Sequence, residues 1–478
     1  MSSSERPSRS SRPGGPDGPV PFPTDEAPGP RPAGPAPAHL LDPAPARPGA
    51  VRAMIVLGTR PEAIKLAPVI RAMTASPLFQ PVVVTTGQHR EMLQQMLGML
   101  GIGVKTDLAV MRDRQRLSEL TARLVDGLGT AIRTERPDLV VVQGDTTTAL
   151  CGALAAFYER VPVAHVEAGL RTGVPDNPFP EELNRRLIGR VARWHFAPTA
   201  RAAGHLRAEG VPAEQVITTG NTVVDNLLWV LAEGAGRSAF RTDGRRVLLT
   251  LHRRENQGDR MRSMGAALRR LADRGDVEIV LPLHRSPAVR EALLPALAGH
   301  PGVRVVDPLD YLDFAATLEA CDLVLTDSGG LQEEAPSLGK PALVLRTTTE
   351  RPEAVEAGAA RLVGTDPQTI LAAAERLLDD PDAYRRMAGA GNPFGDGRAA
   401  ERIVARLTED FGGEPALETA HLGEWASAGG TTADDGRTPG DPVVAATPAS
   451  AAAASSIASA IVPAPGRGDP AGSYDPVA

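Results

Sequence analysis

Residues 325–341, LTDSGGLQEEAPSLGKP, combine a glycine turn with two carboxylates. The apolar residues before the turn predict a buried strand, and those after it predict a helix. Such a turn presents backbone N–H groups to an anion and suits a phosphate. No Lys follows Gly330, as it would in a nucleotide-triphosphate loop. We therefore interpret Ser328, Gly329 and Gly330 as residues that bind a diphosphate.

The two carboxylates that follow need a partner other than the phosphates. A helix N-terminus stabilises an anion by about 0.5–2 kcal/mol. A carboxylate about 4 Å from a phosphate opposes it by about 4 kcal/mol at an effective dielectric constant of about 20. A Glu in this helix must therefore face away from the phosphates or bind a neutral group such as a ribose diol. We assign the ribose to Glu334, and the alternative is that Gln332 and Glu333 only complement the helix dipole.

Three basic residues can supply the positive charge that a diphosphate requires. Arg60 and Lys65 straddle the first predicted strand–helix junction, in GTRPEAIK, and Arg351 follows a later loop, in RTTTERPE. Arg suits bidentate contact with phosphate, and Lys supplies a point charge. Taken alone, Lys65 on a helix also fits a solvent-facing residue.

Three carboxylates and one histidine remain as candidates for proton transfer. Asp145, Glu167 and Glu181 lie in separate segments of the first half, and His252 ends a predicted strand of the second half. Carboxylates that converge on one cleft force their pKa values apart, which gives an acid and a base in one site. For Glu181, which follows Pro180, the alternative is a charge at a helix N-terminus.

The sequence contains no pattern for metal or redox chemistry beside these residues. H-E-x-x-H and G-x-S-x-G are absent, and GIGVKT at residue 101 is not a dinucleotide fingerprint. The two cysteines, Cys151 and Cys321, lie far apart, which excludes a Cys-based metal site and suits a reducing cytoplasm. We expect a reaction that uses neither metal nor redox cofactor.

Alternating strands and helices must position these residues. The first series of short apolar runs is VRAMIVL, PVVVTT, DLVVVQ, VPVAHV and WHFAP, and the second is RVLLTL, VEIVLP, VRVVD, DLVLT and PALVL. Such strands between amphipathic helices indicate parallel sheets covered on both faces. Two series predict two doubly wound α/β domains that change over near ITTGNTVVDNL, residues 217–227. Because every candidate cluster follows a strand, we expect one cleft built from two sets of loops.

The ends of the chain differ from this pattern. The first fifty residues and the last stretch are rich in Pro, Ser, Gly and Ala and carry few large apolar side chains, which predicts disorder. No apolar run reaches the ~20 residues of a membrane helix, and no signal segment opens the chain. The net charge of −7 argues against a general nucleic-acid binder. We expect a soluble cytoplasmic protein.

Ten motifs together resemble the non-hydrolysing UDP-N-acetylglucosamine 2-epimerases of bacteria. The motifs are GTRPEAIK, QHREML, GDTTT, HVEAGLRTG, PEELNRR, GNTVVDNLLW, HRREN, TDSGGLQEEAPSLGKP, TTERPEAV and NPFGDG, and the resemblance runs from about residue 54 to about 407. It implies a glycosyltransferase-B architecture in which two Rossmann-like domains close over a nucleotide sugar. The expected division is a tail (1–50), an N-terminal domain (51–219), a UDP-binding C-terminal domain (220–397), a helix returning to the N-terminal domain (398–412) and a second tail (413–478).

The resemblance also implies a reaction. Family members interconvert UDP-N-acetylglucosamine and UDP-N-acetylmannosamine without NAD or metal, by anti elimination of UDP to a bound glycal and re-addition. The product would supply N-acetylmannosamine units for cell-envelope polysaccharide. The family's catalytic positions match Asp145, Glu167, Glu181 and His252, and which carboxylate is acid and which is base stays open. The substrate-binding positions match Arg60, Lys65, Phe314 beside the base, Ser328, Gly329, Gly330, Glu334 and Arg351.

Further expectations follow from the family. Its bacterial members bind a second UDP-N-acetylglucosamine as activator, and the matching loops carry Gln88, Arg90, Arg253 and His284. Relatives often have Gln where this chain has Leu309, which bears on uracil recognition. We expect a homodimer. The alternatives are a hydrolysing relative that releases N-acetylmannosamine and UDP, and an inactive nucleotide-sugar binding or regulatory protein on the same fold.

Overall fold

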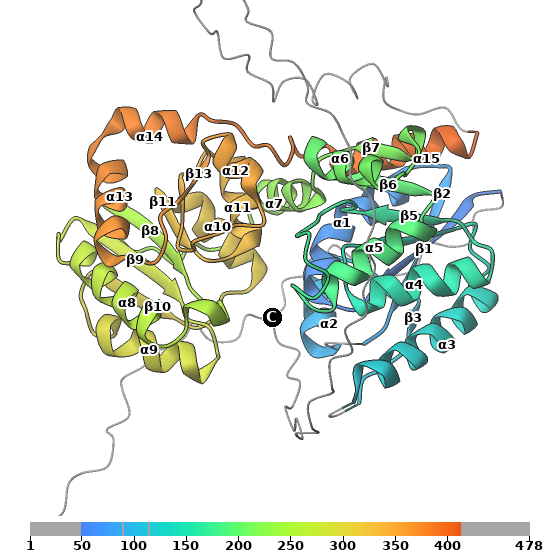
Figure 1. The fold of residues 1–478 in the computed structure, drawn as a ribbon, viewed down its shortest axis with the longest axis horizontal. Coiled ribbons are helices and arrows are strands. Elements are labelled where there is room, and N and C mark those ends of the chain that lie inside the picture. The colour runs from blue at the N-terminus through green and yellow to red at the C-terminus, as the bar shows by residue number, and fades with distance from the viewer. Residues whose placement is uncertain (1–48, 88–89, 113–114, 413–478) are drawn as a thin grey trace, which may run out of the picture.

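The computed structural model describes residues 49–87, 90–112 and 115–412. Within this part of the chain two parallel sheets lie side by side, each covered by helices on both faces (Figure 1). The tails predicted for residues 1–50 and 413–478 lie outside the described residues, except for Gly49 and Ala50. The predicted α/β fold with two doubly wound domains is confirmed, and the architecture is that of the glycosyltransferase-B class.

The N-terminal sheet has seven parallel strands in the order β3-β2-β1-β4-β5-β6-β7. Apolar side chains fill most strand positions, because helices cover both faces and leave neither open to water. The strands are β1 Val51–Leu57, β2 Phe79–Thr85, β3 Thr106–Asp107, β4 Leu139–Gln143, β5 Val163–Val166, β6 Trp194–Ala197 and β7 Val216–Thr218. The helices are α1 Arg60–Ala75, α2 Arg90–Met99, α3 Leu117–Glu135, α4 Thr147–Tyr158, α5 Glu181–Val191 and α6 Ala200–Ala208.

The C-terminal sheet has six parallel strands in the order β10-β9-β8-β11-β12-β13. Its strands are β8 Arg245–Thr250, β9 Val277–Pro282, β10 Val303–Val306, β11 Leu323–Thr326, β12 Ala342–Val344 and β13 Ala360–Leu362. Its helices are α8 Asp259–Ala272, α9 Pro287–Leu297, α10 Tyr311–Ala320, α11 Gly329–Glu334, α12 Pro352–Glu356, α13 Pro367–Asp379 and α14 Pro381–Ala388. Short 3-10 turns lie at Ala213–Gln215, Arg254–Asn256 and Ala335–Leu338. Both sheets start from a central strand and add strands first on one side and then on the other, as dinucleotide-binding folds do.

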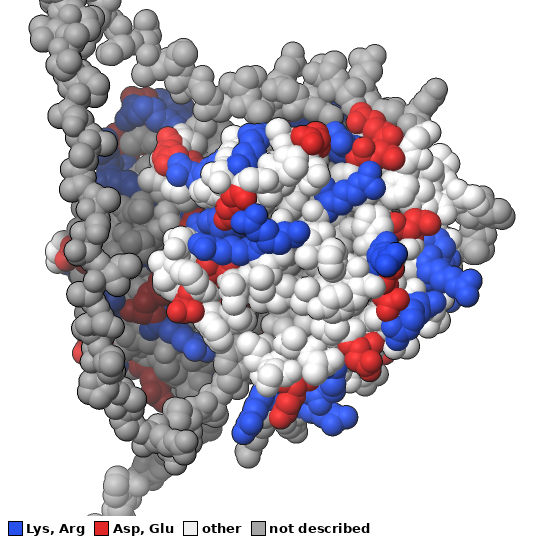
Figure 2. Space-filling view, turned by 45° about the vertical axis from the view of Figure 1, so that its right-hand side comes forward, with Lys and Arg blue, Asp and Glu red and all other residues white. Residues whose placement is uncertain are grey.

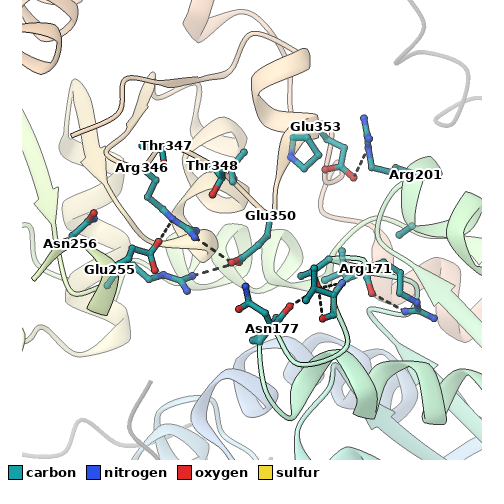
Figure 3. Close-up of a pocket in the computed structure, with 18 of the residues that line it drawn as sticks. Arg171, Asn177, Arg201, Glu255, Asn256, Arg346, Thr347, Thr348, Glu350 and Glu353 are labelled. Carbon is teal, nitrogen blue, oxygen red and sulfur yellow. Dashed lines mark hydrogen bonds and ion pairs between the residues drawn. The ribbon is translucent and has the colours of Figure 1, made fainter. Parts of the chain in front are cut away.

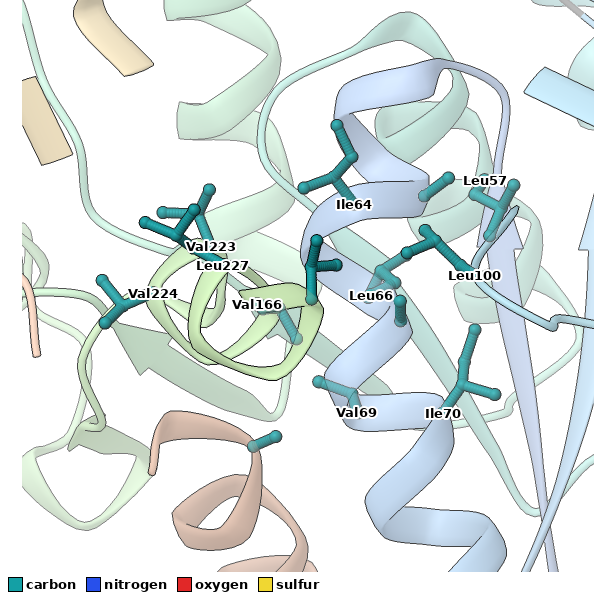
Figure 4. Packing of buried hydrophobic residues seen from close by; sticks show 14 of the residues in the cluster. Leu57, Ile64, Leu66, Val69, Ile70, Leu100, Val166, Val223, Val224 and Leu227 are labelled. Atoms are coloured by element: carbon teal, nitrogen blue, oxygen red, sulfur yellow. The ribbon is translucent and has the colours of Figure 1, made fainter. Parts of the chain in front are cut away.

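Two helices join the domains. α7, Thr222–Ala232, follows the crossover of the chain and packs against α1 on one side and α10 and α11 on the other. One cluster of buried side chains includes Val223, Leu227 and Ile64, and it extends to Leu248 in the C-terminal sheet (Figure 4). The last described helix, α15 Ala399–Asp410, packs against α1, and Trp194 Nε1 donates to Asp410 Oδ2 at 2.6 Å. The chain therefore crosses between the domains twice.

In the described residues no helix has the length and apolar character needed to cross a membrane. Figure 2 turns the N-terminal domain toward the viewer. Lys and Arg are interspersed there with Asp and Glu, and broad uncharged areas separate them. Both cysteines, Cys151 and Cys321, are buried and free.

Candidate active site

The candidate residues gather at the carboxyl ends of the central strands. β1 lies between β2 and β4, and β8 lies between β9 and β11. Lys65 belongs to the helix after β1, Asp145 follows β4, and Ser328 follows β11. These are the points at which strand order reverses, where doubly wound folds bind their ligands.

The GTRPEAIK segment places Lys65 by means of a buried carboxylate. Glu62 is fully buried and accepts hydrogen bonds from the backbone N–H groups of Gly58 (2.9 Å) and Thr59 (2.7 Å). Its other oxygen accepts from Thr146 Oγ1 at 2.6 Å, which ties the start of α1 to the start of α4. A Cβ on Gly58 would lie 2.4 Å from Thr86 Oγ1, so this close approach requires glycine. The junction that precedes Lys65 is therefore rigid.

Lys65 forms a buried ion pair with Glu167 at the end of β5. Lys65 Nζ lies 2.5 Å from Glu167 Oε1, and the Gln143 amide donates to Oε2. Glu167 has a φ of 61°, which non-glycine residues adopt rarely and often at functional sites. Burial acts to raise the pKa of Glu167, but Lys65 and Arg351 hold it below its ordinary value. Glu167 is ionised at neutral pH.

Asp145 and Glu181 lie near this pair and have pKa values shifted the other way. Asp145 Oδ2 accepts a hydrogen bond from Arg185, yet burial raises the pKa of Asp145 above its ordinary value. Glu181 is the first residue of α5, and burial, together with the charge of Asp145, raises its pKa as well. The three carboxylates therefore differ in how readily they hold a proton, as an acid and a base in one site must.

His252 lies in the loop after β8 and contacts a carboxylate that the sequence reading did not single out. His252 Nδ1 lies 3.2 Å from Asp327 Oδ1, and Asp327 is fully buried. Asp327 also accepts the backbone N–H groups of His252 and Arg253 and the amide of Asn256, so it fixes the whole loop. Burial lowers the pKa of His252, and the charge of Asp327 opposes this shift. The imidazole ring of His284 stacks on that of His252, with the ring centroids 5.8 Å apart.

The structure does not support the alternative in which Gln332 and Glu333 only complement the helix dipole. Glu333 is 1% exposed, and its Oε1 accepts a hydrogen bond from Arg351 Nε. Gln332 is fully buried, donates to Ser328 O at 3.1 Å and accepts from Thr349 Oγ1 at 2.5 Å. Both side chains connect α11 to the loops around it. They do not serve as solvent-facing complements to the dipole.

The charges of Glu334 and Arg60 influence each other across the two domains. Glu334 is 8% exposed, and burial, with the charge of Glu333, raises its pKa to about 7. Burial lowers the pKa of Arg60, and the charge of Glu334 opposes this. A Cβ on Gly330 would meet only ordinary contacts, the nearest at 3.8 Å. The glycines after Ser328 thus leave space between Glu334 and the turn.

The remaining predicted residues are less closely connected to this group. Phe314 of α10 is partly buried against the apolar cluster that joins the domains. Arg253 Nη2 lies 3.7 Å from Glu350 Oε2. Gln88 lies outside the described residues, and Arg90 begins α2.

The described residues also enclose an open cavity of about 580 Å³. The 170–178 loop and residues of α6 line one side, and Arg253, Arg346, Thr347–Glu350, Pro352 and Glu353 line the other. Figure 3 shows Arg346 between Glu255 and Glu350, across from Asn177 and Arg171. Of the predicted site residues only Arg253 lines this cavity. Its two walls come from different domains, so it forms part of the space between them.

The structure thus gathers seven of the predicted residues into one group and leaves His252 in another. The members of this group interact with one another directly or through their charges. They are Lys65, Asp145, Glu167, Glu181, Glu334, Arg60 and Arg351. His252 is grouped with Asp327 and His284. Sequence reasoning did not single out Glu62, Gln143, Asn221 and Asp327, and it did not foresee the ion pair of Glu333 with Arg351. In the described chain no set of three or more His, Cys, Asp or Glu side chains is arranged to hold a metal ion.

Comparison with known proteins agrees with this architecture. Residues 71–408 match the sequence profile of a family described as UDP-N-acetylglucosamine 2-epimerase. The chain is 46% identical over 365 residues to the UDP-N-acetylglucosamine 2-epimerase of Bacillus subtilis, covering 76% of this chain and 96% of the relative. It is 46% identical over 369 residues to that of Escherichia coli K12, covering 75% and 98%. The crystal structure of the Neisseria meningitidis enzyme bound to UDP-GlcNAc superposes with a TM-score of 0.70 at 42% identity, covering 75% of this chain and all of that one. The chain belongs to the UDP-N-acetylglucosamine 2-epimerase family.

Proposed function

We propose that this protein interconverts UDP-N-acetylglucosamine and UDP-N-acetylmannosamine without releasing free sugar. The observation that carries the proposal is the ion pair of Glu167 with Lys65, which lies within the influence of the charges of Arg351 and Asp145. Asp145 in turn acts on Glu181. Acid and base groups with opposite pKa shifts lie beside two cations. That combination suits proton transfer coupled to the departure of an anionic leaving group.

The reaction requires both functions at once. The proton on carbon 2 of the sugar has no neighbouring carbonyl to acidify it, so its removal must be coupled to loss of the diphosphate at carbon 1. Cations and backbone N–H groups stabilise that leaving group. Elimination then gives a bound glycal, and UDP adds back while a proton is delivered to the opposite face. Inversion therefore uses a proton acceptor and a proton donor on two sides of the ring.

Within this proposal the three carboxylates take different roles. Glu167, whose pKa is held low, is the proton acceptor. Asp145 and Glu181, whose pKa values burial raises, are the candidate donors. His252 acts on the diphosphate, with its ring oriented by Asp327.

The nucleotide would lie across both domains. Ser328, Gly329 and Gly330 would bind the diphosphate together with Arg60, Lys65 and Arg351. Glu334 would bind the ribose diol, and Phe314 would contact the uracil. The space that Gly330 leaves beside Ser328 and Glu334 and the influence of the Glu334 charge on Arg60 support this placement. Gln88, Arg90, Arg253 and His284 stay a predicted second nucleotide-sugar site. Supply of N-acetylmannosamine for cell-envelope polysaccharide and a cytoplasmic location also stay predictions.

Incubation with UDP-N-acetylglucosamine in deuterated water, followed by proton NMR, tests the proposal. We expect deuterium at carbon 2 and a mixture of both UDP-sugars. If free N-acetylmannosamine and UDP were the main products, the proposal would be wrong and the protein would be a hydrolysing epimerase. Absence of exchange would reduce the protein to a binding or regulatory role.

A further inference from the structure

Asn221 occupies the point at which the chain crosses from the first domain to the second. It lies between β7 and α7 and is 1% exposed. Its Oδ1 accepts the backbone N–H of Val223 at 3.1 Å and so caps α7. Its own backbone N–H donates to Phe394 O at 2.6 Å, in the segment through which the chain returns. The position of Asn221 is therefore fixed from both crossings.

The Asn221 amide donates to one carboxylate from each domain. Nδ2 lies 3.1 Å from Glu167 Oε1 and 3.0 Å from Glu333 Oε2. An amide NH₂ has two hydrogens, and these two contacts use both. Each carboxylate also holds a cation, since Glu167 pairs with Lys65 and Glu333 pairs with Arg351. Five buried side chains from both domains thus form one chain of contacts.

The two cations in this series of contacts, Lys65 and Arg351, have a second partner in the proposed reaction. Lys65 and Arg351 are the groups placed on the diphosphate, and a phosphate group competes with a carboxylate for the same donors. A carboxylate whose cation turns toward a ligand keeps its place only if another donor holds it. Gln143 is such a donor for Glu167 alone, whereas Asn221 donates to both Glu167 and Glu333 and so holds the two carboxylates together. Asn221 carries no charge that a phosphate could attract.

We infer that Asn221 is a positioning residue for the reaction, which holds Glu167 of one domain against Glu333 of the other while Lys65 and Arg351 contact the diphosphate. The inference rests on the proposed function and adds a residue to it. Asn221 itself need not touch the substrate. Its effect passes through Glu167, whose surroundings include the charges of Lys65, Arg351, Asp145 and Glu333.

The test uses Asn221→Ser in the full-length chain. Serine is as good a helix cap as asparagine, but its side chain is too short to donate to both carboxylates. The control Asp366→Ala removes the cap of α13, where Asp366 Oδ2 accepts from Thr369 N at 2.8 Å in the outer part of the C-terminal domain. Rates of deuterium incorporation at carbon 2, KM, the pH profile of kcat and the melting temperature are measured for both variants and the parent.

We expect Asn221→Ser to lower kcat by about ten- to a hundredfold, the size expected for a lost hydrogen bond to a charged group. KM should change by less than about threefold, since the cations still bind the phosphates. The acidic limb of the pH profile should move to higher pH, because Glu167 loses a donor to its ionised form. Asp366→Ala should lower only the melting temperature.

An unchanged kcat and pH profile in Asn221→Ser, with at most a loss of melting temperature, would overturn the inference and leave Asn221 as a helix cap. Asn221→Asp is the second variant, because it keeps both cap and size if the serine variant does not fold. It replaces the donor by a carboxylate, so its kcat should fall and recover partly at low pH, where the acid form can donate. A parent that exchanges no deuterium while still binding UDP would instead overturn the proposed function.

Discussion

Glu334 changes its protonation near neutral pH. Its pKa is raised to about 7 by burial and by Glu333, against the charges of Lys65 and Arg60. A ribose diol donates two hydroxyl groups and binds an ionised carboxylate more strongly than the neutral acid. We therefore expect the dissociation constant of UDP, measured by calorimetric titration, to rise as the pH falls from about 8 to about 6.

Glu334→Gln provides the control for this prediction, since UDP itself loses charge in the same range. The variant should bind UDP about ten- to a hundredfold more weakly at pH 8, because a hydrogen bond to a charged acceptor is lost. Its remaining pH dependence should be that of the nucleotide alone. Equal affinity of parent and variant would remove Glu334 from the ribose.

Asp327 gives a second prediction at the scale of one residue. Its charge is what opposes the effect of burial on His252, so Asp327→Asn should lower the pKa of His252 further. The asparagine keeps the size of the side chain but presents one oxygen where Asp327 accepts several hydrogen bonds. We expect kcat to fall by at least about tenfold, because His252, which acts on the diphosphate in the proposed reaction, loses the charged group that orients its ring. NMR titration of His252 checks the pKa, and an unchanged kcat would remove its catalytic role.

The sequence could place His252 and Glu167 at strand ends but could not reveal what holds them. LQEE reads locally as the polar part of a helix, and nothing in it indicates that Glu333 faces Arg351. Asn221 is 54 positions from Glu167 and 112 from Glu333. Contacts of that kind depend on how two domains pack, whereas periodicity reports only the face of one element.

At the scale of elements, one helix cap joins the two crossings of the chain. Asp225 of α7 accepts the backbone N–H of Ala400 at 2.7 Å and so caps α15. The carboxylate is buried, and burial raises its pKa to about 6. A raised pKa in the folded state means that the ionised form destabilises the fold. Stability from this group is fully present below about pH 4, the pKa of an unfolded Asp, and is lost as the pH rises through about 6.

Asp225→Asn should therefore remove a pH-dependent penalty. Asparagine can still accept from Ala400 N, but it carries no charge to bury. The difference in free energy of unfolding between parent and variant should change by up to about 3 kcal/mol between pH 4 and pH 7, in favour of the variant at pH 7. Urea unfolding at several pH values measures it.

Asp366→Asn is the control of opposite sign for this experiment. Asp366 caps α13 in an exposed position, and hydrogen bonds from Thr369 hold its pKa below the ordinary value. Its contribution is present above the unfolded pKa and is lost as the pH falls through the lower folded pKa. If the free energies of unfolding of the parent and the Asp225→Asn variant changed with pH in parallel, the cost assigned to burying the Asp225 charge beside α15 would be contradicted.

The strands and their parallel order could be predicted because each apolar run is covered on both faces, which leaves a continuous hydrophobic signal. The packing of α7 against α1 could not. GNTVVDNLLW predicts a helix with two apolar sides, but only the structure assigns one side to α1 and the other to α10 and α11. For α15 the return to the N-terminal domain is expected from the family resemblance alone, because its amphipathic pattern does not indicate which domain it covers.

At the scale of the whole molecule, both chain crossings and the Asn221 contacts lie in one region between the sheets. The apolar cluster around α7 continues from the N-terminal sheet into the C-terminal sheet. The hydrogen-bonded carboxylates and the hydrophobic cluster therefore lie in the same region between the two domains. The domains are joined where the proposed reaction requires side chains from both of them at fixed relative positions. The open cavity lies to one side of that junction.

The expected homodimer belongs to the same scale, and we propose that the two copies meet through α4 and α5. These helices pack against each other and expose large apolar side chains, with Phe157 57%, Tyr158 66%, Leu183 46% and Leu187 42% accessible. Exposed apolar groups on adjacent helices mark interaction sites, and a stable dimer buries about 800 Å² per partner.

Phe157→Lys combined with Tyr158→Lys should dissociate the dimer, since two cations on each copy would have to be desolvated. Their position at the carboxyl end of α4 suits positive charge, so the folded monomer should survive. Light scattering after size exclusion at micromolar concentration measures the mass. The control Leu228→Lys, on α7, should leave the mass unchanged, and a monomeric parent or a double variant that stays dimeric would refute this interface.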